Sequence, residues 1–366
     1  MLSWPVLDRH NRGMPSAPDD LSPEVAVRLA RPADREAWDT FVAGSCGGIL
    51  MQTWGWGELR RRSGWRVLRL IAEGEGGWRA AIQILYRKLL PGGLGWAYAP
   101  RGPALASSSD LRAAERLFSR ARIELLRRGI LLLRLDPEWD LDAVEATTLR
   151  QRLRLRPAHF DIQHRRTWLV DLPSSAPAAL AALPASTRRN INISARAKVA
   201  VSIGRDPRDV ACFYQLHLQT VGRQKFQARP RSYYEAAVEE LGAWVFLAAL
   251  DGEPLAGAVG TACGPRLIYL YGGTSTARPE VRASYALHWT MIQWGIQHGC
   301  TEYDMWGVPR NFDPSNPAHG YALFKTRWGG RLASHSGLLV APMLGPLDIP
   351  AHRLEAWVLR RRPLLT

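Results

Sequence analysis

Apolar and polar positions form two series of elements that follow the same order along the chain. The first series predicts three strands, a helix and a fourth strand, at 65–72, 78–86, 94–100, about 110–128 and 130–136. The second series predicts the same elements at 244–250, 255–263, 267–271, about 284–298 and 302–306. The first strands begin 179 residues apart and the last begin 172 apart. This near-constant offset predicts a duplicated domain; the alternative is the chance recurrence of a common strand meander.

The second predicted helix has one apolar face. Four apolar residues recur at the spacing of an amphipathic helix: Tyr285, Trp289, Ile292 and Ile296. Gly299 follows, and glycine is the residue that most readily adopts the left-handed conformation at a helix end. We therefore expect this helix to pack its apolar face against the neighbouring strands.

Length and charge narrow the class of protein. The chain has 366 residues, of which 46% are hydrophobic and 22% charged, and this length favours two globular domains. Lysine and arginine number 48 against 33 aspartates and glutamates, a formal net charge of +15. Such a charge favours polyanionic partners, including RNA, anionic lipid and nucleotide diphosphates. The alternative is an arginine-rich composition with solvated basic faces.

The sequence does not resemble that of a secreted, membrane-spanning or metal-binding protein. Residues 1–22 lack the order of a signal peptide and predict a flexible tail. No apolar run reaches the roughly 18 residues of a spanning helix. The four cysteines are not spaced as a metal-binding or redox pair. We therefore expect a cytoplasmic protein that holds no metal.

Three meandering strands, a helix and a further strand resemble the acyl-CoA N-acyltransferase (GNAT) fold. The resemblance implies an α/β (α+β) protein of two tandem GNAT-like domains, with mixed sheets flanked by helices. The predicted units are the tail at 1–22, domains at 23–160 and 161–337, and a segment at 338–366 that packs back on the first domain. Neither half shows the glycine-rich pyrophosphate loop of that fold, so a coenzyme A donor is disfavoured and no cofactor is expected.

The stretch from Tyr269 to Gly330 carries the most specific resemblance. A strand ends in Gly-Gly, a helix and the strand EYDMWGV follow, and after a Pro/Asn loop comes Phe324-Lys325 before Trp-Gly-Gly. This order resembles the FemABX family, strongly over about 180–340 and more weakly over 50–135. The family implies a transferase that moves an amino acid from aminoacyl-tRNA to a peptidoglycan precursor, lipid II or UDP-MurNAc-pentapeptide.

The resemblance implies a set of acceptor-binding residues. Arg60 stands at the phosphate-binding lysine of the family's Q-S-x-x-W-x-x-x-K segment, and Arg223 stands in its T-x-x-R segment. Tyr269 and Tyr271 alternate with a leucine, so we expect both on one strand face along the precursor cleft. The alternatives are arginines that only cap helices and tyrosines that are buried with satisfied hydroxyl groups.

A second set is implied for the donor. Lys325 is expected to be catalytic and to bind tRNA, with Phe324 stacking on the terminal adenine and Arg327 adding charge. Arg188 and Arg189 open a helix that Ser186 or Thr187 is expected to cap. Arginines there oppose the helix dipole, a cost that a bound anion would offset. The alternatives are a surface lysine and a solvated basic face.

Other polar residues are expected to be structural. Asp304, in the strand EYDMWGV, is interpreted as a cap of the next loop, and His217 and His288 as packing or surface groups. YAPRGPAL at 98–105 resembles the family's Y-x-x-R-G-P segment but lacks the aspartate that often follows it. The absence of a Ser-His-Asp set, a metal cluster and a nucleophilic cysteine favours direct transfer without an acyl-enzyme.

The function expected is the transfer of an amino acid, such as glycine, alanine or serine, from aminoacyl-tRNA to the side-chain amine of a peptidoglycan precursor peptide. The expected protein is a monomer whose basic surface suits peripheral contact with the inner face of the plasma membrane. One alternative is a GNAT-fold N-acyltransferase that uses acyl-CoA or acylates another amine. The other is a non-catalytic RNA-binding module.

Overall fold

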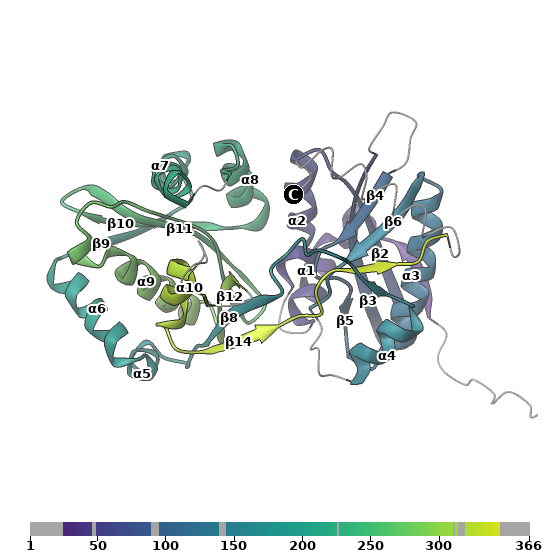
Figure 1. The fold of residues 1–366 in the computed structure, drawn as a ribbon. Coiled ribbons are helices and arrows are strands. Elements are labelled where there is room, and N and C mark those ends of the chain that lie inside the picture. The colour runs from purple at the N-terminus through teal and green to yellow at the C-terminus, as the bar shows by residue number, and fades with distance from the viewer. Residues whose placement is uncertain are drawn as a thin grey trace, which may run out of the picture.

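Two mixed β-sheets, each flanked by helices, lie side by side (Figure 1). The computed structural model describes residues 25–45, 49–88, 95–138, 144–224, 227–309, 312–313 and 319–344. The predicted α/β class is confirmed. The predicted tail at 1–22 and most of the segment at 338–366 lie outside the described residues, and the predicted domain limits stay predictions.

The first sheet has eight strands in the order β1-β2-β3-β4-β6-β15-β7, with β5 beside β3. Its strands are β1 (Ala26–Leu29), β2 (Arg66–Gly74), β3 (Gly77–Lys88), β4 (Gly95–Ala99), β5 (Ala104–Leu105), β6 (Ile130–Leu135), β7 (Arg156–Pro157) and β15 (Leu339–Ala341). Helices α3 (Leu111–Leu126) and α4 (Val144–Arg152) cover one face, and α1 (Arg35–Gly44) and α2 (Trp54–Arg62) pack on the other.

The second sheet has seven strands in the order β14-β8-β13-β12-β11-β10-β9. They are β8 (Arg166–Asp171), β9 (Ala200–Gly204), β10 (Trp244–Leu250), β11 (Glu253–Cys263), β12 (Arg266–Thr274), β13 (Glu302–Val308) and β14 (Arg331–Ser334). One face packs against α5 (Ala176–Ala182), α6 (Ala185–Arg196) and α9 (Ala283–Gln297), and the other against α7 (Pro207–Gln224) and α8 (Arg231–Leu241). Helix α10 (His319–Thr326) follows β13, and 3-10 turns occur at Pro32–Asp34, Leu50–Gln52 and Pro279–Val281.

The two sheets repeat one connection. β4 and β6 pair in parallel, as do β12 and β13, and in both cases a helix separates the two strands along the chain. Parallel neighbours need such a crossover. These are the strands and helices of the two predicted series. The apolar face predicted for the second helix is confirmed, because its four residues pack into one core cluster with the strands, and Gly299 has φ +77°.

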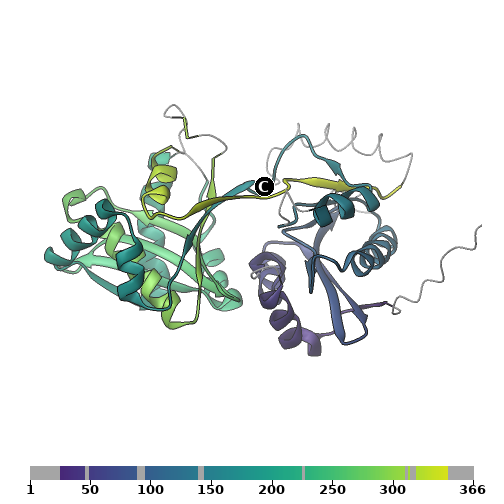
Figure 2. The ribbon, with the colours of Figure 1, turned by 90° about the horizontal axis from the view of Figure 1, so that it is seen from below.

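Helix α2 connects the two halves. Trp56 and Leu59 of α2 are buried in the same apolar cluster as Tyr233 and Tyr234 of α8. Arg266 of β12 forms ion pairs with Glu138, which follows β6, and with Glu302 of β13 at 2.9 Å. The chain from β14 to β15 also crosses from the second sheet to the first (Figures 1 and 2).

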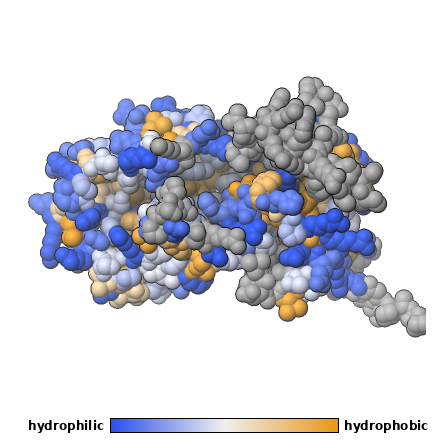
Figure 3. Space-filling view, viewed as in Figure 1, coloured by the Kyte–Doolittle hydropathy of each residue, from blue (hydrophilic) through white to orange (hydrophobic). Residues whose placement is uncertain are grey.

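One face of the molecule is mainly polar where the structure describes it (Figure 3). Figure 3 shows hydrophilic residues over most of one face, with apolar residues in scattered groups. Within the ranges given above, no helix combines the length and the apolar character that crossing a membrane requires.

Candidate functional site

The parallel strands β12 and β13 separate in the middle of the second sheet. They pair from Arg266 and Glu302 to Ile268 and Asp304, and β12 then continues to Thr274 without β13. Both strands are irregular where they part: the register of β12 with β11 shifts at Leu270, and that of β13 with β8 shifts after Asp304. Bulges of this kind are frequent beside active sites. We call residues 269–271 of β12 and 304–307 of β13 the strand fork.

Tyr269 and Tyr271 point to opposite faces of the sheet at the strand fork. The Tyr269 ring lies 4.8 Å from that of His288 in α9. The Tyr271 hydroxyl lies 3.1 Å from the Tyr233 hydroxyl of α8 on the other face. The prediction of a shared face is therefore wrong. Alternation holds only in a regular strand, and the extra residue at Leu270 reverses the side on which Tyr271 emerges.

Lys325 of α10 lies on the α9 face and is 7% exposed. Its Nζ donates a hydrogen bond to the carbonyl oxygen of Gly307 at 2.8 Å and lies 6.0 Å from the Tyr269 ring centre. Burial lowers the pKa of Lys325 to about 7, while the charge of Asp304 acts in the opposite direction. The alternative of a surface lysine is therefore wrong.

Aromatic side chains enclose Lys325 on this face. Phe324 is half-buried, with its ring 5.4 Å from that of Tyr285 and 5.0 Å from that of His288. His288 is 3% exposed, and its Nδ1 lies 2.7 Å from the Tyr303 hydroxyl. Burial, followed by the charge of Lys325, lowers the pKa of His288 to about 3, so it is neutral at physiological pH. This agrees with the expected packing role.

The arginines predicted to bind tRNA lie near helix α10. The Thr187 hydroxyl donates a hydrogen bond to the carbonyl oxygen of Arg327 and so joins α6 to the end of α10. Arg189 and Arg327 are exposed, whereas Arg188 donates to the carbonyl oxygens of Leu183 and, at 3.1 Å, of Ala181. The expectation that Ser186 or Thr187 caps α6 is wrong: Pro184 is the N-cap and makes no side-chain cap.

Arg60 lies on the opposite side of the strand fork, beside an arginine that the sequence analysis missed. The Arg60 guanidinium carbon lies 5.6 Å from the Trp65 ring centre, and that of Arg87 lies 4.5 Å from it. Neither arginine has a carboxylate partner among the residues that the structure describes. Burial, and then the charge of Arg60, lower the pKa of Arg87. Two cations on one indole without an acid suit an anionic ligand.

A row of aromatic residues leads from Arg60 into the second sheet. The charge of Arg60 acts on the Tyr271 hydroxyl, which in turn contacts Tyr233. The Arg229 guanidinium carbon lies 5.5 Å from the Tyr233 ring centre. Tyr233 is not among the residues predicted from the sequence, although the spacing of Arg229 and Tyr233, four residues apart around the start of α8, could have indicated it.

Arg223 makes different contacts. It is exposed at the end of α7, and its Nη2 donates to the Thr274 carbonyl oxygen at 2.7 Å, to the Thr274 hydroxyl at 2.9 Å and to the Thr220 hydroxyl at 3.1 Å. These bonds join the ends of α7 and β12. They hold Arg223 against β12 and not on the terminal carbonyl oxygens of α7, and the described contacts do not connect Arg223 with Arg60.

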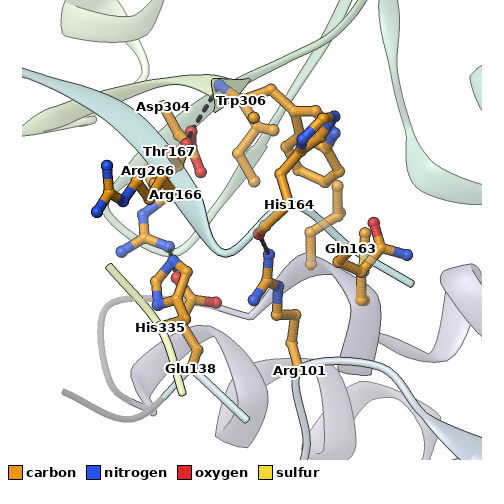
Figure 4. A pocket seen from close by; sticks show the side chains of 14 residues that line it. Arg101, Glu138, Gln163, His164, Arg166, Thr167, Arg266, Asp304, Trp306 and His335 are labelled. Atoms are coloured by element: carbon orange, nitrogen blue, oxygen red, sulfur yellow. Dashed lines mark hydrogen bonds and ion pairs between the residues drawn. The ribbon is translucent and has the colours of Figure 1, made fainter. Parts of the chain in front are cut away.

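A cavity of about 30 Å³ lies between the two halves, beside Asp304, Trp306 and Gly307 (Figure 4). Arg101 reaches across it and donates to the His164 carbonyl oxygen at 2.8 Å. The Asp304 carboxylate accepts hydrogen bonds from the Thr167 hydroxyl and, at 2.7 Å, from the Trp306 N–H. Asp304 thus braces its own strand, in accord with the structural role expected.

Two transferases are similar in sequence to this chain over most of its length. A family model described as acetyltransferase (GNAT) domain matches residues 185–313. The chain is 25% identical to the UDP-N-acetylmuramoylpentapeptide-lysine N(6)-alanyltransferase of Weissella viridescens, over 77% of this chain and 86% of the relative. It is 21% identical to the lipid II:glycine glycyltransferase of Staphylococcus haemolyticus (strain JCSC1435), over 82% and 89% respectively.

In sequence and in fold, the chain resembles the Fem family. A solved structure described as FemX matches with a TM-score of 0.79 at 19% identity, over 88% of this chain and 99% of that one. A tandem GNAT protein from the clavulanic acid biosynthesis pathway matches with a TM-score of 0.53 at 13% identity, over 87% and 99%. The predicted resemblance to this family and the tandem GNAT-like fold are confirmed, and the relatives' names support a transferase activity.

Proposed function

We propose that this protein transfers an amino acid from aminoacyl-tRNA to the side-chain amine of a peptidoglycan precursor peptide. One observation carries the proposal: the strand fork separates a basic, aromatic set on one face from a buried lysine on the other. Arg60 and Tyr271 belong to the first set, and Lys325 is the lysine. Two substrates can thus approach from opposite faces and meet where the strands part.

The acceptor is assigned to the face of Arg60. Guanidinium groups bind phosphate oxygens bidentately, and Arg60 and Arg87 share Trp65 without a described carboxylate between them. The two relatives are named for UDP-N-acetylmuramoylpentapeptide, which carries a diphosphate, and for lipid II. Tyr271 and Tyr233 then offer hydroxyl groups towards the strand fork.

The donor is assigned to the face of α10. Arg189 and Arg327 are exposed there and can contact tRNA phosphates. Phe324 keeps part of its ring exposed, which leaves room for stacking on the terminal adenine. Lys325 lies behind it at the strand fork.

The reaction is aminolysis of an ester. The neutral amine of the acceptor attacks the aminoacyl carbonyl carbon, the new C–N bond forms, and the C–O bond to the terminal ribose breaks. The amine loses one proton, and the ribose oxygen takes up one. A lysine whose pKa is about 7 can carry the charge that stabilises the oxyanion and can donate a proton to the leaving oxygen near neutral pH.

Product analysis tests this function. The purified chain is incubated with charged total tRNA and, in separate reactions, with each precursor form, and the products are identified by mass. The expected product is a precursor heavier by one or more amino-acid residues. Acyl transfer from acyl-CoA without tRNA would support the N-acyltransferase alternative, and tRNA binding that is indifferent to aminoacylation, without product, would support the RNA-binding alternative.

The cellular setting belongs to the same proposal. A net charge of +15 suits both tRNA and an anionic lipid surface. We therefore expect a cytoplasmic monomer that contacts the inner membrane surface peripherally. Co-sedimentation with vesicles that contain anionic lipid, compared with neutral vesicles, tests the membrane contact, and light scattering tests the oligomeric state.

A further inference from the structure

The bulge in β13 holds its backbone in an unusual conformation. From Asp304 to Gly307 the strand advances three residues while its partner β8 advances two, from Leu169 to Thr167. Trp306 has φ +68°, in the left-handed region that residues with a side chain seldom adopt. Such a conformation persists only where neighbouring groups hold it. The bulge therefore needs a brace.

Asp304 provides the brace. Its side chain is 6% exposed, and its Oδ1 accepts both the Trp306 N–H at 2.7 Å and the Thr167 hydroxyl (Figure 4). The first bond closes the bulge within β13, and the second joins it to β8. Burial raises the pKa of the Asp304 carboxyl, and the charge of Arg266 and the Thr167 hydrogen bond oppose that rise.

The bulge directs the Gly307 carbonyl oxygen to the Nζ of Lys325, 2.8 Å away. Gly307 also has no room for a side chain, because a Cβ there would lie 2.2 Å from the His164 ring. The backbone of residue 307 is thus fixed on one side by His164 and on the other by the braced bulge. His164 and the braced bulge together set the position of the Gly307 carbonyl oxygen. That oxygen in turn sets the position of the Lys325 amine.

Charged and titratable groups face Lys325 from several elements. Asp304 is on β13, and its negative charge favours the protonated amine. Burial, and then the charge of Lys325, lower the pKa of His288 in α9 and of His164. Tyr269 of β12 and Tyr321 of α10 contribute rings 6.0 and 5.1 Å from Nζ. Within the described residues, Asp304 is the carboxylate that acts on Lys325.

We propose that Asp304 is a positioning residue, which acts through the β13 bulge to hold the ammonium group of Lys325 at the strand fork. The carboxylate braces the backbone that supplies the Gly307 carbonyl oxygen, and its charge stabilises the protonated amine. The consequence for catalysis rests on the proposed function, whereas the positioning of Lys325 does not.

The composition of the chain allows a direct test. It contains four lysines against 44 arginines, at positions 88, 198, 225 and 325. Protein labelled with ¹³C at the lysine ε-carbon therefore gives few side-chain signals, and Lys325→Met identifies the signal of Lys325. A pH titration of that signal reports protonation of the amine without any substrate.

Asp304→Asn removes the charge and keeps an oxygen that accepts both hydrogen bonds. We expect the titration midpoint of Lys325 to fall by about one unit or more. Glu302→Gln is the matched control, because Glu302 lies on the same strand but pairs with Arg266 and Arg331. The control should leave the midpoint unchanged. An unchanged midpoint in folded Asp304→Asn would overturn the proposal.

Thr167→Val keeps the charge but removes one hydrogen-bond donor, and it serves if Asp304→Asn does not fold. A carboxylate with fewer donors ionises less readily, so the Lys325 midpoint should again fall, by a smaller amount. Thr167→Ser retains the hydroxyl group and should show the wild-type midpoint of Lys325. If Asp304→Asn does not fold, a wild-type Lys325 midpoint in Thr167→Val would overturn the proposal.

Transfer assays separate this proposal from the proposed function. If both hold, the alkaline limb of the turnover profile of Asp304→Asn moves to lower pH together with the Lys325 midpoint. If the midpoint moves but the turnover profile does not, Asp304 still positions Lys325, and the catalytic role of Lys325 is wrong.

Discussion

The Nζ of Lys325 donates a hydrogen bond to the backbone carbonyl oxygen of Gly307 at 2.8 Å. This contact joins α10 to the point where β13 leaves β12. It keeps a lysine inside a nearly closed apolar and aromatic environment, with 7% of the side chain exposed. A lysine whose stem only covers apolar surface would not need such a position. We make four predictions from this contact and from the residues on the opposite face of the strand fork.

Lys325→Met should abolish most transfer without unfolding the protein. Methionine keeps the apolar stem and deletes the amine, so the substitution separates packing from charge. Removing a charge that stabilises a transition state costs roughly a hundredfold in turnover. Lys198→Met is the control, because Lys198 is exposed and should change the rate little. If Lys325→Met transfers at a near wild-type rate, the donor site must be sought at Arg188 and Arg189.

The stability of the wild type should depend on pH through Lys325. The folded pKa is about 7 and the ordinary value is 10.5, so between these values the unfolded chain binds the proton and the folded chain does not. The contribution of Lys325 to the free energy of unfolding therefore rises between pH 7 and pH 10.5, by up to about 1.4 kcal/mol per pH unit. Below pH 7 the buried charge destabilises the fold. Urea unfolding should find Lys325→Met more stable than the wild type at pH 6, by a margin that shrinks at pH 9; a margin independent of pH would contradict this.

Arg60→Ala and Arg87→Ala should each raise the KM for the acceptor and leave tRNA binding unchanged. Loss of one charge-assisted contact costs on the order of 1.5–3 kcal/mol of binding. The double variant should lose less than the sum, because both arginines lie on Trp65 and are expected to share one ligand. Arg61→Ala is the control from the same helix, since Arg61 is exposed and pairs with Glu58. Equal weakening of both substrates would argue against the assignment.

Arg229→Ala should affect the acceptor more than Arg223→Ala does. Arg229 lies over Tyr233, in the aromatic row that reaches Tyr271. Arg223 is already engaged by Thr220 and Thr274, so its loss should mainly loosen the end of α7. Acceptor KM values and thermal midpoints of the two variants, measured in parallel, check this. A larger rise in KM for Arg223→Ala would restore Arg223 as the acceptor contact predicted from the sequence.

The periodic part of the structure could be predicted from the sequence. The two series of strands and helices occur as expected, the apolar face of α9 packs on its strands, and Gly299 follows that helix with φ +77°. Local patterns are sufficient here, because the helical and strand periods are properties of consecutive residues. The motif order from Tyr269 to Gly330 likewise indicated the Fem family.

The arrangement of the site depended on contacts between distant parts of the chain. The bulge at Leu270 turns the Tyr271 side chain to the other face of the sheet, and this bulge arises from the pairing of β12 with β11. Lys325 is buried because β13, α9 and its own helix surround it, and that burial lowers its pKa. Arg60 and Arg87 meet on Trp65 because a helix and a strand pack together. Strand register, burial and charge proximity are properties of the packed molecule, so residue type and spacing alone do not reveal them.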